Sequence, residues 1–397
     1  MDSARKILHM DLDAFFCAVE ELFDPTLKGK PFAVGGDPGY RGVVSSCSYP
    51  ARRLGVHSAM PMSKAVRICP GLLIVHGSHQ KYSEKSHEVM AILRNWTPLM
   101  EQISIDEAFL DVSDLLADPR QIALDIQKEI NTRLLLPCSF GVAANKLVAK
   151  IANTIGKKNS KSGNYPNAVT RILPGTEAAF LAPLPVGELW GVGDRTEKVL
   201  RDLGISRIGQ LAAYPEDRLQ KIFGKHTNSI RLRAMGQDDR PVDPEPQEAK
   251  SVSQEYTFTK DVDDEVLLRK TILRQSDQIG SRLRKYGLSG NTVRLKLRWD
   301  DFTTLSRQIK LDQRICQNDL INAHAQNLFS EIWRKEARPV RLIGVGISGF
   351  SEEAVQLSLF QESSEKTDRL LRAVDEIRTR YGEKGLKRGI ELEAEEF

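Results

Sequence analysis

The sequence predicts a multi-domain α+β fold, and three features lead to that prediction. At 397 residues the chain is long enough for two or more domains that each bury a core. Strand-like and helix-like apolar patterns alternate in the first third and again after residue 251. Between these regions lie a helical stretch with glycine at its turns and a segment rich in proline and charge. We therefore expect at least two α+β domains joined by a helical region and an exposed linker.

The first region is expected to form a mixed sheet with helices packed on one face. Strands are predicted at 6–12, 31–36, 42–48 and 138–144, and helices at 13–23, 78–96, 118–136 and 145–157. The stretch LMEQISIDEAFLDVS, 99–113, is patterned as two short strands joined by a turn. The polar segment KKNSKSGNYPN, 157–167, is expected to separate this sheet domain from the helical region.

The later parts of the chain differ in charge. Two helix–turn–helix units are predicted within 188–226, a linker at 240–251, and a second α+β domain beyond it. From Arg282 to Arg341 there are 13 Lys and Arg against 6 Asp and Glu, whereas the tail from Glu352 to Phe397 has 8 against 12. The basic segment suggests a surface that faces a polyanion, although a solvated basic face without a ligand remains the alternative.

The composition of 41% hydrophobic and 28% charged residues is ordinary for a soluble globular protein. No apolar run is long enough to span a bilayer, and the N-terminus MDSARKILHMDLD lacks the features of a signal peptide. We expect a cytoplasmic protein without membrane contact. The 5 cysteines are scattered and form no CxxC pair, which favours reduced core residues over metal or disulfide sites.

Acidic residues gather at two predicted strand ends. Asp106 and Glu107 lie side by side at the turn of the 99–113 hairpin, among apolar neighbours. Asp11 and Asp13, at the end of the first strand, should point to the same side because strand side chains alternate. If the two ends meet, the acids would repel one another unless divalent cations neutralise them. The alternatives are a solvated turn with two surface acids, and helix capping by Asp13.

Such a cluster of oxygen ligands suits Mg²⁺, and two ions could activate an attacking hydroxyl and stabilise a departing pyrophosphate. Groups that could hold a triphosphate are available in SYPARRLGV, where Tyr49 and the cation Arg52 lie three apart on one helical face and Pro50 suits the first turn. Lys157 could add a further positive charge. Each of these residues alone is more often an ordinary surface side chain.

Two further motifs suggest binding to larger partners. The glycines Gly191 and Gly193 of GVGDRTEKV place a tight turn at a helix start, where free backbone N–H groups can hold a DNA phosphate. The pentapeptide QLSLF, Gln356 to Phe360, is an apolar cluster in an acidic tail. A short motif that docks into a partner's groove explains it better than core packing does.

Taken together, DLDAFFCAVE, SYPARRLGV, SIDEAFLD, NKLVAKIAN, WGVGDRTEKVL and QLSLF resemble the Y-family DNA polymerases, and within them the bacterial DNA polymerase IV group of the DinB type. The resemblance covers nearly the whole chain in the family's order. It implies a palm at 1–10 and 78–170, fingers at 11–77, and a thumb with helix–hairpin–helix elements at 171–240. It further implies a linker at 241–250, a DNA-binding little finger at 251–350 and a clamp-binding tail at 351–397.

The resemblance also assigns individual residues. It implies that Asp11, Asp106, Glu107 and the backbone carbonyl of Leu12 bind two Mg²⁺ ions, with Asp13 less directly involved. Tyr49, Arg52 and Lys157 would bind the deoxynucleoside triphosphate, and Phe16 would be the steric gate that excludes a 2′-hydroxyl. The tail residues Gln356, Leu357, Leu359 and Phe360 would bind the sliding clamp, the β subunit of DNA polymerase III.

The predicted function is template-directed DNA synthesis on a primer–template by a monomeric, low-fidelity translesion enzyme. One alternative is a DNA- and clamp-binding protein that has lost catalysis, and another is a nucleotidyl cyclase with a similar palm. The chain departs from the family pattern at Pro50, where acidic residues are common, and in the length of 157–167. In the tail that follows QLSLF, the segment RLLRAVDEIRTRYG, 369–382, has the pattern of a helix.

Overall fold

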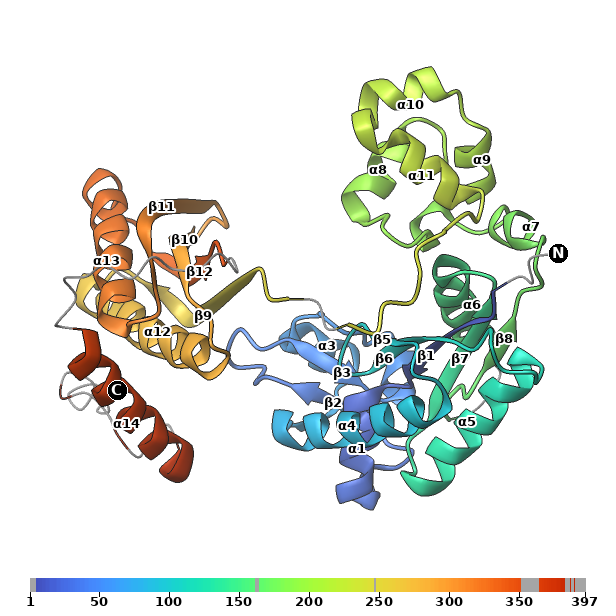
Figure 1. Cartoon of the computed structure of the whole chain (residues 1–397), viewed down its shortest axis with the longest axis horizontal. Coiled ribbons are helices and arrows are strands. Elements are labelled where there is room, and N and C mark those ends of the chain that lie inside the picture. Colours follow the sequence, from blue (N-terminus) through green and yellow to red (C-terminus); the bar gives the residue numbers. More distant parts are fainter. Residues whose placement is uncertain are drawn as a thin grey trace. The chain divides into compact units, whose positions relative to one another are not determined.

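The computed structural model describes residues 5–160, 164–245, 248–350, 364–382, 386 and 389. These residues form two compact units that divide between residues 246 and 247 (Figure 1). Each unit contains at least one sheet with helices packed against it. The multi-domain α+β class predicted from the sequence is therefore confirmed.

The first unit is built on a five-stranded sheet in the order β5-β6-β1-β7-β8. Its strands are β1 (Ile7–Leu12), β5 (Met100–Gln102), β6 (Glu107–Asp111), β7 (Cys138–Ala143) and β8 (Val169–Arg171). The central strand β1 runs antiparallel to both β6 and β7. Because β8, which follows the segment 157–167, pairs with β7, the sheet domain continues beyond that segment, and the expectation that the segment marks the domain's end was wrong.

Helices cover both faces of this sheet, whereas we expected them on one. Helices α4 (His79–Trp96) and α5 (Pro119–Arg133) pack on the face that carries Leu8 and Met10. Helix α6 (Lys146–Asn159) packs on the opposite face, which carries Ile7 and Phe109 (Figure 1). The second face was missed because polar residues alternate with its few apolar ones and weaken the sequence signal.

Close packing of α6 on the sheet depends on a glycine. A Cβ atom at Gly141 of β7 would lie 1.9 Å from the carbonyl oxygen of Ala149 in α6. Any larger residue there would push the helix away from the strand. This contact matters for the site because α6 carries Lys150, Asn153 and Lys157.

A smaller sheet with the order β3-β2-β4 is inserted between β1 and α4. It consists of β2 (Phe32–Gly35), β3 (Val44–Cys47) and β4 (Leu73–Val75), with the helices α1 (Phe15–Phe23), α2 (Tyr49–Arg53) and α3 (Met62–Ile68) and the 3-10 turn η1 (Pro25–Leu27). Ser48 caps α2, since its hydroxyl accepts from the Ala51 amide, and Pro50 lies in the first turn as predicted.

The rest of the first unit is a small helical region. It comprises α7 (Glu177–Leu181), α8 (Asp194–Asp202), α9 (Ile208–Ala213), α10 (Glu216–Phe223) and α11 (Thr227–Ala234), with the 3-10 turns η2 (Val186–Glu188) and η3 (Gly224–His226). Its core of Leu200, Ile208, Leu211 and Ile230 belongs to the same cluster as the inner face of α6. Asn145 fastens it to the sheet domain through a 2.9 Å hydrogen bond to the Gly236 carbonyl.

The second unit is a four-stranded antiparallel sheet in the order β11-β10-β12-β9. Its elements are β9 (Ser251–Val262), α12 (Glu265–Lys285), β10 (Gly290–Trp299), β11 (Thr304–Ile315), α13 (Asn318–Lys335), β12 (Val340–Ser348) and α14 (Ser364–Tyr381). Alternation in β10 buries Val293, Leu295 and Leu297 against α12 and α13. Arg294, Lys296 and Arg298 of the same strand therefore face away from the helices.

Candidate active site

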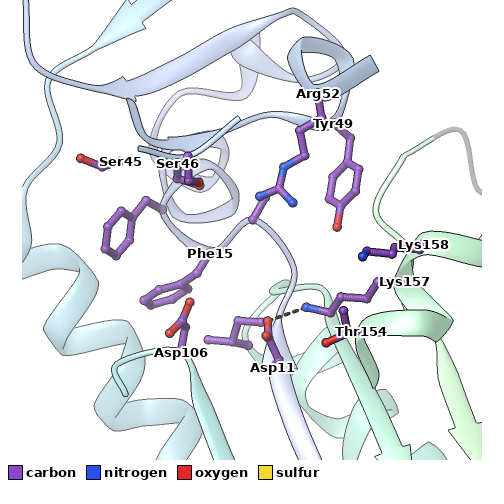
Figure 2. A pocket seen from close by; sticks show the side chains of 14 residues that line it. Asp11, Phe15, Ser45, Ser46, Tyr49, Arg52, Asp106, Thr154, Lys157 and Lys158 are labelled. Carbon is purple, nitrogen blue, oxygen red and sulfur yellow. Dashed lines mark hydrogen bonds and ion pairs between the residues drawn. The ribbon is translucent and has the colours of Figure 1, made fainter. Parts of the chain in front are cut away.

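The end of β1 and the tip of the β5–β6 hairpin meet at one cavity. Asp11 pairs directly with Glu107 across the two strands, and the Leu12 amide donates a 2.9 Å hydrogen bond to the Asp106 carbonyl. As a result Asp11, Leu12 and Asp106 line the same cavity, whose volume is about 460 Å³ (Figure 2). Two carboxylates that are far apart in sequence thus share one space.

Asp106 is half-buried in this cavity rather than solvated at a surface turn. Burial raises the pKa of Asp106, the carboxylates of Asp11 and Glu107 add to the rise, and a 2.5 Å hydrogen bond from Ser104 opposes it. The charged form of Asp106 is therefore disfavoured in the ligand-free protein. A cation bound between Asp11 and Asp106 would reverse that effect.

Lys157 places a positive charge beside the carboxylates at the end of β1. Its Nζ lies 2.5 Å from Asp11 and 2.9 Å from Asp13. Burial opposes the charge, but the two carboxylates raise the pKa of Lys157 above its ordinary value. The side chain extends from α6 into the cavity and remains protonated at neutral pH (Figure 2).

Asp13 does not line the cavity as Asp11 does, but both carboxylates contact the ammonium group of Lys157, so they point to the same side as expected. Asp13 lies one residue beyond the end of β1 at Leu12. Asp13 is fully buried and accepts hydrogen bonds from the Ser139 hydroxyl and the Asn167 amide. Nor does it cap α1, whose capping residue is Ala14. Asp13 is therefore a buried ion-pair partner of Lys157.

Glu107 faces α6 and is not among the residues that line the cavity. Its carboxylate lies 2.6 Å from Lys150 Nζ and 3.1 Å from His9 Nε2. Although burial acts in the opposite direction, these two hydrogen bonds lower the pKa of Glu107 to about 2. Glu107 is therefore a fixed anion directly beside Asp11, with its charge already compensated.

The other wall of the cavity carries groups suited to an anion. Tyr49 and Arg52 project from α2 over the space that Asp11 and Lys157 enter from below (Figure 2). Arg52 lies with its guanidinium carbon 4.9 Å from the centre of the Tyr49 ring and donates from Nε to the Cys47 carbonyl. These contacts orient the guanidinium. Burial raises the pKa of Tyr49 to about 12, so its hydroxyl stays a hydrogen-bond donor.

Phe16 also lines the cavity. Its ring stacks on Tyr82 of α4, whose hydroxyl donates a 2.5 Å hydrogen bond to Glu20. A ring supported on its far side cannot retreat from a bulky ligand. Phe15, the preceding residue, also lines the cavity.

The cavity fits a metal that is shared with a substrate. Within the part of the chain that the structure describes, no three His, Cys, Asp or Glu side chains are grouped so that they could hold an ion by themselves. Asp11 and Asp106 nevertheless offer two carboxylates, and burial disfavours the charge on one of them. Mg²⁺ is usually bound in this way, by one or two carboxylates plus water and substrate phosphates.

The predicted phosphate-binding turn lies in the helical region. Gly191 has a φ of 95°, and Gly193 is the capping residue of α8 with no side-chain cap. A Cβ atom at Gly193 would meet nothing, so the backbone N–H groups at the start of α8 are open to a ligand. The tail residues Gln356, Leu357, Leu359 and Phe360 lie outside the described residues.

Family models match most of the chain. The impB/mucB/samB family matches residues 10–154, its C-terminal domain matches 249–359, and the HHH motif of the IMS family matches 174–205. DNA polymerase IV of Dehalococcoides mccartyi is 38% identical over 390 residues, which cover 98% of this chain and 97% of that protein. DNA polymerase IV of Bacillus anthracis is 36% identical over 396 residues, with 98% and 94% covered. The chain belongs to the Y-family DNA polymerases.

Solved structures agree with this assignment. A Y-family chimera of the Dbh and Dpo4 polymerases superposes with a TM-score of 0.77 at 28% identity, covering 87% of this chain and 99% of that one. DinB from Sulfolobus solfataricus gives a TM-score of 0.57 at 27% identity, with coverage of 87% and 99%. The protein is thus a DNA-directed DNA polymerase with a palm, fingers, thumb and little finger. Among its described residues, no helix has the length and apolar character needed to cross a bilayer.

Several residues of the polymerase's cavity were not identified from the sequence. They are Ala14, Phe15, Ser45, Ser46, Ser58, Thr154 and Lys158. His9 and Lys150, which hold Glu107, were also missed. Simple spacing could have found both: His9 is two residues before Asp11 on the same face of β1, and Lys150 is two helical turns before Lys157 on α6.

Proposed function

We propose that this polymerase adds deoxynucleotides to a primer 3′-hydroxyl under the direction of a template, releases pyrophosphate, and tolerates damaged template bases at low fidelity. The observation that carries the proposal is the cavity in which Asp11 and Asp106 oppose Tyr49 and Arg52, with Lys157 beside Asp11. Carboxylates on one wall and cationic or hydrogen-bonding groups on the other suit a metal-bound triphosphate.

The proposed metal is Mg²⁺, two ions per site, held by Asp11, Asp106, Glu107 and the Leu12 carbonyl. When bound, the ions would supply Lewis acidity that favours deprotonation of the 3′-hydroxyl and stabilises the leaving pyrophosphate. The chain's own groups do the positioning. Arg52 and Tyr49 would orient the triphosphate by hydrogen bonds, and Lys157 would compensate its charge next to Asp11.

Selection of the sugar is assigned to Phe16. Since its ring is backed by Tyr82, the wall cannot yield to an added 2′-hydroxyl. A ribonucleotide would therefore be displaced from the reacting position, whereas a deoxynucleotide fits. This is a positional effect, and small displacements of a reacting group can lower the rate of a reaction strongly.

Primer–template DNA would be held outside the cavity by sequence-independent contacts. The backbone N–H groups near Gly191 and Gly193 suit a phosphate, and the face of the little-finger sheet with Arg294, Lys296 and Arg298 offers further positive charge. We propose that QLSLF binds the sliding clamp, the β subunit of DNA polymerase III, and so raises processivity by tethering a monomeric enzyme in the cytoplasm.

Two other functions compete with this proposal. A DNA- and clamp-binding protein without catalysis would not need Asp11 and Asp106 at one cavity, where their repulsion carries a cost. A nucleotidyl cyclase would not need the phosphate-binding turn of the thumb or the outward cations of β10. The acidic cavity argues against the first alternative, and the turn of the thumb with the cations of β10 argues against the second.

The test is primer extension with Mg²⁺ on an undamaged primer–template, with each deoxynucleotide supplied singly. The natural chain should add only the template-matched nucleotide, and Glu107→Ala should lose this activity while still binding DNA. Tight DNA binding by the natural chain without any extension would instead support the non-catalytic alternative. Formation of a cyclic nucleotide without a template would support the cyclase.

A further inference from the structure

The carboxylate of Glu107 is held away from the cavity by groups of the palm. Lys150 Nζ lies 2.6 Å and His9 Nε2 lies 3.1 Å from the same oxygen, Oε2. Asp11, the direct partner of Glu107 across the two strands, does line the cavity. Both carboxylates are therefore paired with a lysine of α6, Asp11 with Lys157 and Glu107 with Lys150, but only Asp11 lines the cavity.

The imidazole of His9 cannot move to release Glu107. Its side chain is 2% exposed, and its Nδ1 accepts from the Asn153 amide at 3.1 Å, so Nε2 is the nitrogen that donates to Glu107. The ring also packs on Phe109, with centroids 4.8 Å apart. His9 is thus a buried donor, whereas the side chain of Lys150, the other partner of Glu107, is 21% exposed and has room to move.

Lys150 has a second contact, on the thumb. Its Nζ lies 5.2 Å from the centre of the Trp190 ring, which is also contacted by the Arg240 guanidinium at 4.7 Å. The Trp190 carbonyl accepts from Arg233, and Gly191 follows directly as the first glycine of the proposed phosphate-binding turn. The ammonium group of Lys150 therefore contacts both the Glu107 carboxylate and Trp190, the residue before this turn.

We propose that Lys150 is a positioning residue that substitutes for a metal cation beside Glu107 in the DNA-free polymerase and holds this carboxylate outside the cavity until a metal ion displaces it. The inference rests on the proposed metal-dependent function. Because Trp190 helps to orient the ammonium group, the strength of this hold depends on the position of the thumb. Metal loading of the site is thereby linked to engagement of the thumb with DNA.

The test measures binding of Mn²⁺ alone to the DNA-free, full-length protein by electron paramagnetic resonance. Removal of a competing positive charge in Lys150→Met should tighten Mn²⁺ binding on the order of tenfold, and Lys150→Arg, which retains the charge, should bind as the natural chain does. The matched control is Lys146→Met. Lys146 lies one turn earlier on α6, pairs with Glu101 and lies 5.3 Å from the Phe109 ring, but does not contact Glu107.

The outcomes separate this inference from the proposed function. Unchanged or weaker Mn²⁺ binding in Lys150→Met, or an equal gain in Lys146→Met, would overturn the role of Lys150 even if the natural chain extends primers normally. If Lys150→Met fails to fold, Lys150→Gln takes its place with the same expectation. Failure of the natural chain both to bind Mn²⁺ and to extend a primer would overturn the proposed function as well.

Discussion

The ring of Phe16 stacks on the ring of Tyr82, with centroids 4.2 Å apart and planes 11° from parallel. Tyr82 is 2% exposed and donates a hydrogen bond to Glu20. The supporting ring of Tyr82 thus belongs to α4, and the ring of Phe16, which lines the cavity, belongs to α1. Close packing of this kind leaves the Phe16 ring no space to turn aside.

Replacing Phe16 with alanine should admit ribonucleotides. Without the ring, the space that excludes a 2′-hydroxyl opens, so the preference for deoxynucleotides should fall on the order of a hundredfold. The measurement is the ratio of kcat/KM for a matched deoxynucleotide and the corresponding ribonucleotide. Tyr82→Phe is the control, because it keeps the stacked ring and removes only the hydroxyl. Full sugar discrimination in Phe16→Ala would remove Phe16 from this role.

Asp106→Ala should abolish synthesis and leave primer–template binding nearly intact. Asp106 lines the cavity, and no described contact ties it to the turn at Gly191 and Gly193, where we propose that DNA phosphate binds. Loss of a group that stabilises the transition state lowers kcat by about 10²- to 10³-fold. Single-turnover extension and a DNA-binding titration would be compared. Asp118→Asn, an exposed palm acid paired with Arg171, should extend normally.

Arg52→Ala should raise the KM for the incoming nucleotide. Hydrogen bonds to charged groups contribute about 1.5–3 kcal/mol, which corresponds to roughly a tenfold to hundredfold weaker interaction. Steady-state extension over a range of nucleotide concentrations measures the change. Arg67→Ala is the control, since Arg67 lies on α3 and its Nε donates to the Ser63 carbonyl rather than into the cavity. An unchanged KM in Arg52→Ala would exclude triphosphate contact.

Much of the fold could be predicted from sequence patterns. The buried strand at Ile7–Leu12, the hairpin that carries Asp106, and α6 at Lys146–Asn159 all follow from simple periodicity. The predictions failed where a strand was short or where polar and apolar residues alternated on one face of the sheet. The strand at Val169–Arg171 has three residues and follows a polar loop, and its pairing with β7 is a long-range contact that local patterns do not encode.

The candidate site shows a similar limit. The acidic residues were apparent from their types and spacing, but their directions were not. Asp13 is fully buried and does not line the cavity, and Glu107 faces Lys150 rather than the cavity. The deciding factors are how deeply each carboxylate is buried and which side chain of a distant helix faces it. Both depend on tertiary packing, so a single sequence did not reveal them.

Replacing Leu359 and Phe360 of QLSLF with alanine should reduce synthesis only when the clamp is present. A docking motif supplies tethering and does not contact the reacting groups, so insertion of a single nucleotide without the clamp should be unchanged. The measurement is product length on a long primed template with and without loaded clamp. Equal stimulation by the clamp in variant and natural chains would show that another segment binds it.

Asp238→Asn should destabilise the polymerase near neutral pH and much less in acid. Burial acts to raise its pKa, but Arg240 and the Leu147 amide lower the pKa of Asp238 below its ordinary 3.8. As pH falls, Asp238 therefore becomes protonated at a lower pH in the folded protein than in the unfolded chain. The stabilisation is present above about pH 4 and is lost as pH falls through the lowered folded-state value. Loss of hydrogen bonds to a charged group costs about 2 kcal/mol, so the Tm should fall by roughly 5 °C at pH 7, with a smaller difference below pH 4. Asp239→Asn, the exposed neighbour, is the control, and a Tm difference independent of pH would contradict the assignment of this effect to the Asp238 charge.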